Sequence, residues 1–380
     1  METTPVARIE RNHGIDLLRI LAMLLATVLH VLKKGGVISA AEGSLAAYSV
    51  VWLLEAAAYC AVNCYALISG YVGYSDTPKP LRLSRCFELW LQVVFYSLTI
   101  TTVYRIVGVG AVKVTNFADA LLPVTSRQYW YFTAYMGMFF FIPLLNALVR
   151  RLDARALASL ALFLTAAFSF YDGFASFRGK DPLALVGGHS PLWLAALYVF
   201  GAAMKKLRIP ERISSKKALI AYASAAVFTA AFKVTGDKLL RFIPGSLFVR
   251  DTSPTVLLCA AALLIVFVRL KPGRILTKFA VLFAPAAFGV YLLHVSPLVF
   301  EHVIGNNFSF IGRLPVPLIP LAVLASAGAI LAVGLAADKI RICLFRLAGI
   351  PKLCEKAETT ARKLWSKAVE RLMPQNRNDL

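Results

Sequence analysis

Long apolar segments recur along this chain of 380 residues, and they constrain its fold more than any other feature. A helix needs roughly 20 mostly apolar residues to cross a hydrocarbon core about 30 Å thick. The sequence offers about ten such segments, and the alternating pattern of a membrane β-barrel is absent. The pattern predicts an all-α polytopic membrane protein with about ten transmembrane helices. We place the segments at residues 14–33, 46–71, 85–105, 129–149, 154–171, 189–206, 217–235, 254–269, 279–300 and 316–337.

The composition agrees with this class and suggests two parts. Hydrophobic residues make up 59% of the chain and charged residues only 16%, whereas a soluble domain averages about 45–50% and about 25%. We expect residues 1–340 to form the membrane domain and residues 341–380 a basic amphipathic cytoplasmic tail. In that tail, apolar residues recur at about helical spacing between lysines and arginines, which is typical of a helix on a membrane surface. A plain solvated tail is the alternative. The six cysteines form neither a zinc pattern nor a disulfide framework, so we expect no metal site.

The net charge of +21 reflects the expected topology. Of the 41 Lys and Arg residues, 28 lie in the N-terminus, alternate loops and the tail, on one side of the membrane. The positive-inside rule places both termini in the cytoplasm, in a multi-pass protein of the cytoplasmic (inner) membrane. The charge therefore indicates attraction to anionic membrane lipids and no nucleic-acid partner. The first segment is longer than a signal peptide and lacks a cleavage site, so we expect a retained helix.

Two ionisable residues, Arg19 and His30, lie inside the first apolar segment. Eleven positions are about three helical turns, so both side chains share one face, about 16 Å apart. Such residues are rare in a membrane and face the bundle interior or a water-filled cavity. The pair predicts a polar track from the cytoplasmic face. Arg19 is a candidate site for a phosphate-bearing ligand, or a snorkelling residue beside Asp16. His30 is a candidate general base, or a structural imidazole bonded to another helix.

Further polar residues are expected at the cytoplasmic level of Arg19. Ser69 and Gly70, near the inner end of the second segment, permit close approach of a ligand or a neighbouring backbone. Arg82 and Arg85 begin the third segment and share a face at (i, i+3) spacing. The three arginines together make a candidate phosphate cradle. Ordinary positive-inside anchoring is the alternative for Arg82 and Arg85.

Three residues are expected at the outer level with His30. Glu55 lies in the outer half of the second segment, as a partner for an imidazole or as a structural bond between helices. His294 lies in the ninth segment at a depth comparable to that of His30, which indicates a shared site or a hydrogen-bonded core histidine. Tyr131 belongs to the aromatic run 129–132. Such a run is typical of an interfacial belt, and stacking of a sugar ring is the alternative.

Taken in order, these motifs resemble the acyltransferase-3 family of integral membrane acyltransferases. More narrowly, they are similar to bacterial enzymes that O-acetylate surface polysaccharides or their precursors. The resemblance covers about residues 12–340, and it is to the stand-alone type, so we expect no extra extracytoplasmic hydrolase-like domain of the kind that some members carry. The motifs that carry it are Arg19-x10-His30, NCYALISGY (63–71), Arg82-x-x-Arg85, YWYFTAYMGMFFFIPLLN (129–146) and FGVYLLHVSPL (288–298).

The resemblance implies transfer of an acyl group, usually acetyl, from cytosolic acyl-CoA to a hydroxyl of a carbohydrate or lipid-linked glycan. Acetyl-CoA is then a donor substrate, and no cofactor is permanently bound. The family roles map onto Arg19 and His30 as the essential catalytic pair, with Arg82 and Arg85 on the donor side. We assign the other candidates by their expected level in the membrane. Ser69 is a donor contact, and the substrate contacts are Glu55, Tyr131 and His294.

Two other functions fit parts of this pattern. A transporter or flippase of an anionic or glycolipid substrate also suits ten helices, an internal Arg–His track and a basic inner surface. A non-catalytic membrane partner in envelope assembly is the other. No internal repeat or matching pair of broken helices is evident, which disfavours the transporter folds built from two halves. Within the enzyme hypothesis, direct transfer with His30 as base and a relay through an acyl-histidine both stay open.

Overall fold

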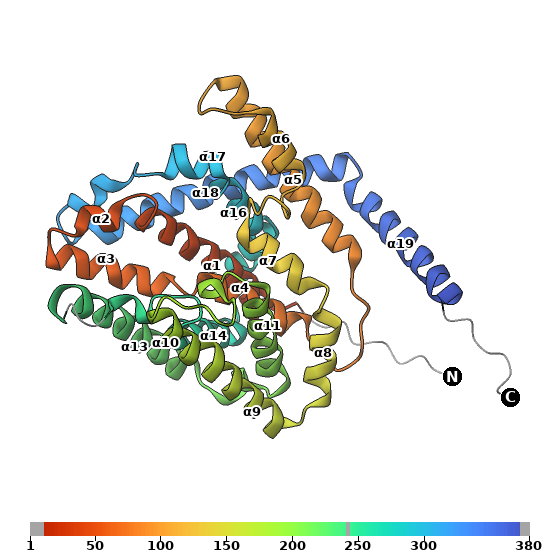
Figure 1. The fold of residues 1–380 in the computed structure, drawn as a ribbon, viewed down its shortest axis with the longest axis horizontal. Coiled ribbons are helices and arrows are strands. Elements are labelled where there is room, and N and C mark those ends of the chain that lie inside the picture. Colours follow the sequence, from red (N-terminus) through yellow and green to blue (C-terminus); the bar gives the residue numbers. More distant parts are fainter. Residues whose placement is uncertain (1–10, 241–243, 373–380) are drawn as a thin grey trace.

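A computed structural model describes residues 11–240 and 244–372 as a bundle of helices without a strand (Figure 1). The helices up to residue 206 are α1 His13–Leu32, α2 Val37–Ala41, α3 Leu45–Ala58, α4 Ala61–Gly73, α5 Leu83–Val107, α6 Val114–Leu121, α7 Trp130–Phe139, α8 Ile142–Arg151, α9 Ala154–Thr165, α10 Asp172–Phe177 and α11 Pro191–Lys206. The later helices are α12 Ile209–Arg212, α13 Ser215–Val234, α14 Pro254–Arg269, α15 Arg274–Phe283, α16 Ala287–His294, α17 Pro297–Val299, α18 Leu318–Leu347 and α19 Ile350–Leu372. Short 3₁₀ and π-helical turns join or extend several of these: Ala166–Tyr171, Val186–Gly188, Thr235–Leu240, Gly245–Phe248, Ala284–Ala286, Phe300–Ile304 and Ser309–Arg313.

Seven helical stretches in the described residues are long and apolar enough to cross a membrane, or eight when the bent pair α7–α8 counts as one span. The prediction of an all-helical polytopic membrane protein is therefore confirmed. The expected number of about ten spans is not confirmed. Two of the expected segments form α11 and α14, which have 16 residues each. A helix of that length covers about 24 Å, less than a hydrocarbon core of about 30 Å.

One predicted segment, 129–149, is broken by a bend of 58° between α7 and α8. Pro143 stands in the first turn of α8. Because proline has no backbone N–H and clashes with the preceding turn, a helix that meets one tends to restart there. The break lets α7 present its first residues to the centre of the bundle. It was not expected from the sequence.

Helix α1 lies at the centre of the packing. It packs against α3, α4, α14, α15, α16 and α18, and 61% of its most apolar window is buried, the largest share among the spans. Its residues contribute to three separate core clusters: Leu18 to the first, Met23 to the second and Val31 to the third. Side chains on the inward faces of α1 are thereby held by several neighbours at once. Arg19 and His30 are thus carried by the candidate span with the largest buried share.

Helices α4 and α11 approach each other closely through glycine. A side-chain carbon added at Gly70 would overlap the backbone carbonyl of Tyr198, and one added at Gly201 would overlap that of Leu67. Lipid tails are as apolar as leucine, so helices in a membrane associate through close van der Waals contact, which small residues permit. The close approach predicted at Gly70 is confirmed, and the partner is a helix backbone.

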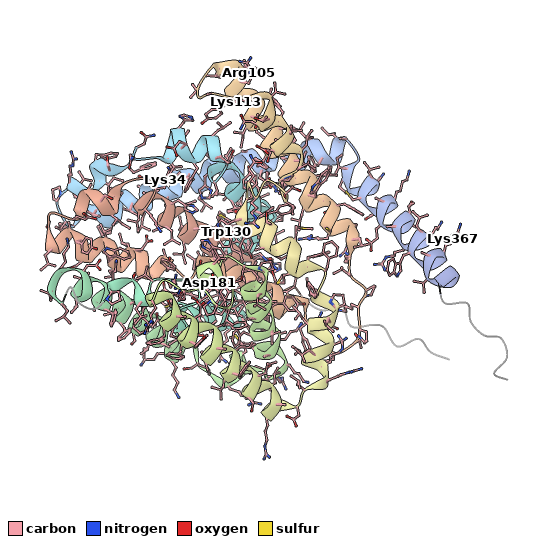
Figure 2. The ribbon with its side chains drawn as sticks, in the orientation of Figure 1. Lys34, Arg105, Lys113, Trp130, Asp181 and Lys367 are labelled. Atoms are coloured by element: carbon pink, nitrogen blue, oxygen red, sulfur yellow. The ribbon has the colours of Figure 1, made fainter. Side chains whose placement is uncertain are left out.

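The described part of the predicted tail, residues 341–372, is mostly helical, and residues 373–380 lie outside the described residues. Helix α18 runs without interruption past residue 340, and α19 then turns away and lies beside the start of α5 (Figure 1). Glu358 accepts a hydrogen bond from the backbone N–H of Ser84 at 3.0 Å, and Arg362 donates to the carbonyl of Leu81 at 2.6 Å. Figure 2 shows Lys367 near the far end of α19. The place of α19 on a membrane surface stays a prediction.

Candidate active site

The first turn of α1 holds a buried carboxylate between two arginines. Asp16 is 1% exposed. It accepts hydrogen bonds from Arg19 Nη1 at 2.7 Å and from Arg11 Nε at 2.7 Å. Asn12 caps the helix by accepting a bond from the N–H of Ile15, and a carboxylate in the first turn is favoured by the helix dipole. The contact between Arg19 and Asp16 that their sequence spacing suggests is therefore present, and it holds the Arg19 guanidinium in place.

Arg19 turns the rest of its guanidinium toward an open space inside the protein. Its side chain is 30% exposed, and it lines a large cavity that opens between the helices. The hydroxyl of Tyr65 donates to the backbone carbonyl of Arg19 at 2.6 Å, which ties α4 to α1 beside the guanidinium. Because Asp16 engages only Nη1, the other N–H groups of Arg19 face the cavity. The role of Arg19 in binding a phosphate-bearing ligand stays a prediction.

The cavity has a volume of about 1700 Å³, larger than the roughly 300–1,000 Å³ of typical ligand sites. Eleven Lys and Arg residues line it against four Asp and Glu residues. A low-dielectric wall lined by one sign of charge concentrates ligands of the opposite sign. The cavity is therefore suited to a large anionic ligand. The cationic lining residues are Arg11, Arg19, Lys79, Arg85, Lys205, Lys206, Arg208, Lys278, Lys339, Arg341 and Arg346.

The predicted donor-side residues are only partly brought together. Ser69 and Arg85 line the same cavity as Arg19. The Ser69 hydroxyl donates to the carbonyl of Tyr65 at 2.9 Å, so its oxygen is left to accept from a ligand. Arg82 stands at the N-cap of α5 and is not among the residues that line the cavity. Two of the three arginines in the expected cradle share the cavity.

The other end of α1 carries a hydrogen bond between two histidines. His30 Nδ1 lies 2.8 Å from His294 Nε2 of α16, and His294 Nδ1 lies 2.6 Å from the carbonyl of Val290. His294 is 2% exposed, and the ring of Phe300 packs edge-on against His30. The expectation that the two histidines share one depth is confirmed by this contact.

The hydrogen-bond partners of the two histidines determine which of their ring nitrogens carry a proton. A backbone carbonyl only accepts hydrogen bonds, so Nδ1 of His294 carries a proton, and Nε2 of a neutral His294 presents its lone pair. Nδ1 of His30 must then donate to it. Neutral His30 is left with its lone pair on Nε2, which is the state that a general base requires. The second histidine orients the first much as a carboxylate or carbonyl orients a ligand histidine.

An aromatic layer made of Tyr65, Tyr131 and Tyr291 borders the cavity and reaches the turn of α16 that precedes His294. Tyr65 and Tyr131 line the cavity, with their ring centroids 6.3 Å apart. The Tyr131 N–H donates to the hydroxyl of Tyr291 at 3.3 Å, and Tyr291 stands one turn before His294. His294 and His30 are not among the residues that line the cavity. The expected continuous polar track from Arg19 to His30 is therefore not confirmed in this conformation.

The remaining predicted contacts are placed as follows. Glu55 is 2% exposed in α3, and its Oε2 has no hydrogen-bond partner among the described residues. It does not bond to His30. Tyr131 faces the same cavity as Arg19, at its aromatic end. Roles of Glu55 and Tyr131 in binding an acceptor stay predictions.

Two polar clusters were missed in the sequence. In α18, Arg341 forms an ion pair with Asp338 at 2.6 Å; their (i, i+3) spacing repeats that of Asp16 and Arg19 and is a signal that was available. Trp130 stands at the start of α7 and is labelled near the middle of the view in Figure 2. Its ring stacks on His189 with centroids 3.9 Å apart, and His189 lies 3.1 Å from Asp251. Neighbouring loops bring these residues together, so no local spacing indicates the cluster.

Comparison with known protein families decides the class. Residues 12–337 match the acyltransferase domain of the acyltransferase-3 family, which is most of the chain. The chain belongs to the acyltransferase-3 family. No curated protein and no solved structure matches it.

Membership gives the basic cavity and the histidine pair a chemical context. An acyltransferase needs a site for an activated acyl donor and a base for the acceptor. The matched residues of this acyltransferase include Arg19, His30 and His294, and the match ends one residue before Asp338. The chain is thus a membrane acyltransferase with two separate polar sites on α1.

Proposed function

We propose that this acyltransferase moves an acetyl group from acetyl-CoA to a hydroxyl of a carbohydrate or cell-envelope glycan. The observation that carries the proposal is the hydrogen-bonded chain from the Val290 carbonyl through His294 to His30. No group among the described residues engages the lone pair of His30 Nε2, and this membrane acyltransferase also has a large basic cavity. In this proposal the basic cavity binds the donor, and the histidine pair transfers the proton.

The donor would bind in the basic cavity. Acyl-CoA carries several phosphate charges and a thin uncharged arm that ends in the thioester. Arginine forks match phosphate geometry with paired charge-assisted hydrogen bonds, and Arg19 and Arg85 face the cavity. We place the cavity on the cytoplasmic side of the inner membrane, because Lys and Arg are concentrated around it and positive residues favour that side. Acyl-CoA is a cytosolic molecule, so this orientation gives it access.

The proton would move through His30. His30 Nε2 takes the proton of the acceptor hydroxyl as the oxygen attacks the thioester carbonyl. A C–O bond forms, and the tetrahedral intermediate collapses with cleavage of the C–S bond. The proton on Nε2 then passes to the departing thiolate, so the products are the ester and CoA in the thiol form. His294 keeps Nδ1 of His30 in the donor role throughout.

The donor arm must pass the aromatic layer to reach His30. Tyr131 and Tyr65 close the cavity toward the histidine pair. Rotation of a tyrosine side chain is a small motion of the kind that commonly gates access to enzyme sites. We assign this gating to the aromatic layer. A closed layer also keeps water from the thioester until the arm is seated.

The acceptor would approach from the outer side. His30 lies at the end of α1 remote from Arg19, about 16 Å along the helix axis. Of the contacts predicted for the acceptor, Glu55 and Tyr131 stay candidates. Both ring nitrogens of His294 are already bonded, to His30 and to the Val290 carbonyl, so we give His294 the role of orienting His30. Membrane lipids and a lipid-linked or polymeric glycan are the partners that this geometry suits.

The test uses purified protein in nanodiscs with labelled acetyl-CoA and a panel of glycan acceptors. Transfer predicts labelled ester and stoichiometric release of free CoA, measured by mass spectrometry and a thiol reagent. Passage of an unmodified anionic or glycolipid substrate across proteoliposomes, with no ester formed, would point to a transporter and contradict the proposal. Glycan analysis of a deletion strain identifies the acceptor as the structure whose acyl ester is lost.

A further inference from the structure

An arginine from near the C-terminal end of the chain also lines the donor cavity. Arg341 of α18 lines the cavity, and its side chain is 11% exposed. Its Nε and Nη2 donate to Asp338 Oδ1 and Oδ2 at 3.0 and 2.6 Å. This two-point bond fixes the plane of the guanidinium. Nη1 and one N–H of Nη2 make no hydrogen bond with the described residues.

Asp338 is a buried carboxylate that holds the guanidinium of Arg341 in place. It is fully buried, and it also accepts hydrogen bonds from Gln92 and from the Tyr96 hydroxyl, both at 3.0 Å. Gly289 of α16 has no side chain where Asp338 packs, and an added carbon there would overlap the carboxylate. Helices α5, α16 and α18 thus together fix the carboxylate of Asp338, which in turn orients Arg341. A buried charge needs such partners because isolation in the protein interior is costly.

The arrangement repeats that of Arg19. In both cases a buried aspartate stands three positions before an arginine on an inward-facing helix, and the arginine faces the same cavity. The two arginines differ in their surroundings. Arg19 is bonded through its carbonyl to Tyr65 of the aromatic layer, whereas Arg341 lies 5.0 Å from the ring of Phe345, beside the lining residue Arg346.

We propose that Arg341 binds a second phosphate group of the donor, positioned by Asp338. The inference rests on the proposed use of acyl-CoA. CoA has a diphosphate next to its pantetheine arm and a separate 3′-phosphate on its ribose. Arg19 stands beside the aromatic layer, where the arm leaves the cavity, and takes the diphosphate. Arg341, which has no bond to that layer, takes the 3′-phosphate.

The experiment compares the binding of CoA and 3′-dephospho-CoA to purified detergent-solubilised protein by isothermal titration calorimetry. Loss of a charge-assisted hydrogen bond corresponds to a change of about tenfold or more in Kd, so the wild type should prefer CoA by about that factor. Arg341→Gln should abolish the preference by weakening CoA alone. Arg346→Gln is the matched control, because it removes a cation of the same cavity that no buried carboxylate orients. It should weaken both ligands equally, by about threefold or less.

Two further variants test the same assignment in case the Arg341→Gln protein does not fold. Arg341→Lys keeps the charge and the ion pair but loses the fork, and should retain part of the preference. Asp338→Asn leaves Arg341 in place without its anchor, and should reduce the preference while 3′-dephospho-CoA binding stays unchanged. Thermal unfolding of each purified variant checks its fold.

The results separate this inference from the proposed function. The 3′-phosphate assignment is overturned if Arg341→Gln lowers the affinities for CoA and 3′-dephospho-CoA equally, or changes neither affinity. Wild-type protein that binds CoA and 3′-dephospho-CoA equally well overturns it too, although donor binding would stand. Wild-type protein that binds neither ligand contradicts the proposed donor itself.

Discussion

His294 reaches across from α16 to hold His30 of α1 through a hydrogen bond of 2.8 Å between Nε2 and Nδ1. The bond joins residues 264 positions apart in the sequence. It gives His30 a defined tautomer without any carboxylate, because the series ends on a backbone carbonyl. Under the proposed mechanism, the proton acceptor is oriented without an additional buried charge, which would be costly inside a membrane.

The first prediction concerns His294 as a positioning residue. Glutamine at this position can donate to the Val290 carbonyl and accept from His30, whereas leucine can do neither. We expect His294→Leu to lower kcat by about 10- to 100-fold, which is part of the roughly 10²–10⁴ that general base catalysis supplies. KM for acetyl-CoA should stay unchanged, and His294→Gln should recover most of the rate. Equal loss in the Leu and Gln variants would contradict the orienting role.

The second prediction concerns the fork of Arg19. Arg19→Lys keeps the charge but loses paired hydrogen bonding to phosphate, so Kd for acetyl-CoA should rise about tenfold. Arg11→Lys is the control, since Arg11 also bonds to Asp16 but has a half-exposed side chain. It should change Kd by about twofold or less. An Arg19→Lys protein with wild-type affinity would remove Arg19 from donor binding.

The third prediction concerns the aromatic layer. Tyr131→Trp adds bulk where the donor arm must pass, and overpacking at a closed contact is costly. We expect turnover to fall about tenfold or more while CoA affinity is kept, because the gating motion is hindered. Tyr131→Phe keeps the ring size and should stay within about threefold of wild type. Parallel rate and calorimetric measurements check this, and faster turnover in the Trp variant would argue against gating.

The fourth prediction concerns pH and the docking of α19. Hydrogen bonds from Ser84 and Arg362 lower the pKa of Glu358 from its ordinary value of 4.5 to about 2. The folded-state pKa is depressed, so the stabilisation by Glu358 is fully present above pH 4.5 and is lost as the pH falls through about 2. The protection factors of the α19 amides, which compare the exchange rate with the intrinsic rate at the same pH, should therefore fall over that window.

A matched pair of variants tests the same contact at pH 7. Glu358→Gln should speed up hydrogen exchange in α19, because the charge that accepts from Ser84 and Arg362 is lost. Glu355→Gln changes an exposed side chain of the same helix and should have no effect. If both variants exchange at the wild-type rate, α19 is held by its other contacts with α5.

Much of the site was readable from the sequence because it depends on local geometry. Helical periodicity places Arg19 and His30 on the same inward-facing helix, and the similar depth of His294 follows from counting residues within two spans. The ion pair of Arg19 with Asp16 is a local (i, i+3) contact of the same kind. The equivalent pair in α18 had the same signal and was overlooked among the charges of the tail.

Other features depend on tertiary packing and leave no local signal. The aromatic layer forms because α4, α7 and α16 meet, and no spacing in any one of them predicts that Tyr65 and Tyr291 flank Tyr131. The expected number of about ten spans is not confirmed, because α11 and α14 are apolar but only 16 residues long. The bend before Pro143 follows from proline chemistry, yet the apolar run around it hides the break.

The most direct test of the account measures acetyl transfer and CoA binding on one preparation of the His30→Ala protein, with His302→Ala as a histidine control outside the site. We predict that His30→Ala loses about 10²–10⁴ in kcat, while its calorimetric Kd for CoA stays at the wild-type value and His302→Ala retains full activity. Wild-type turnover by His30→Ala would contradict the central claim that this imidazole accepts the proton of the acceptor hydroxyl.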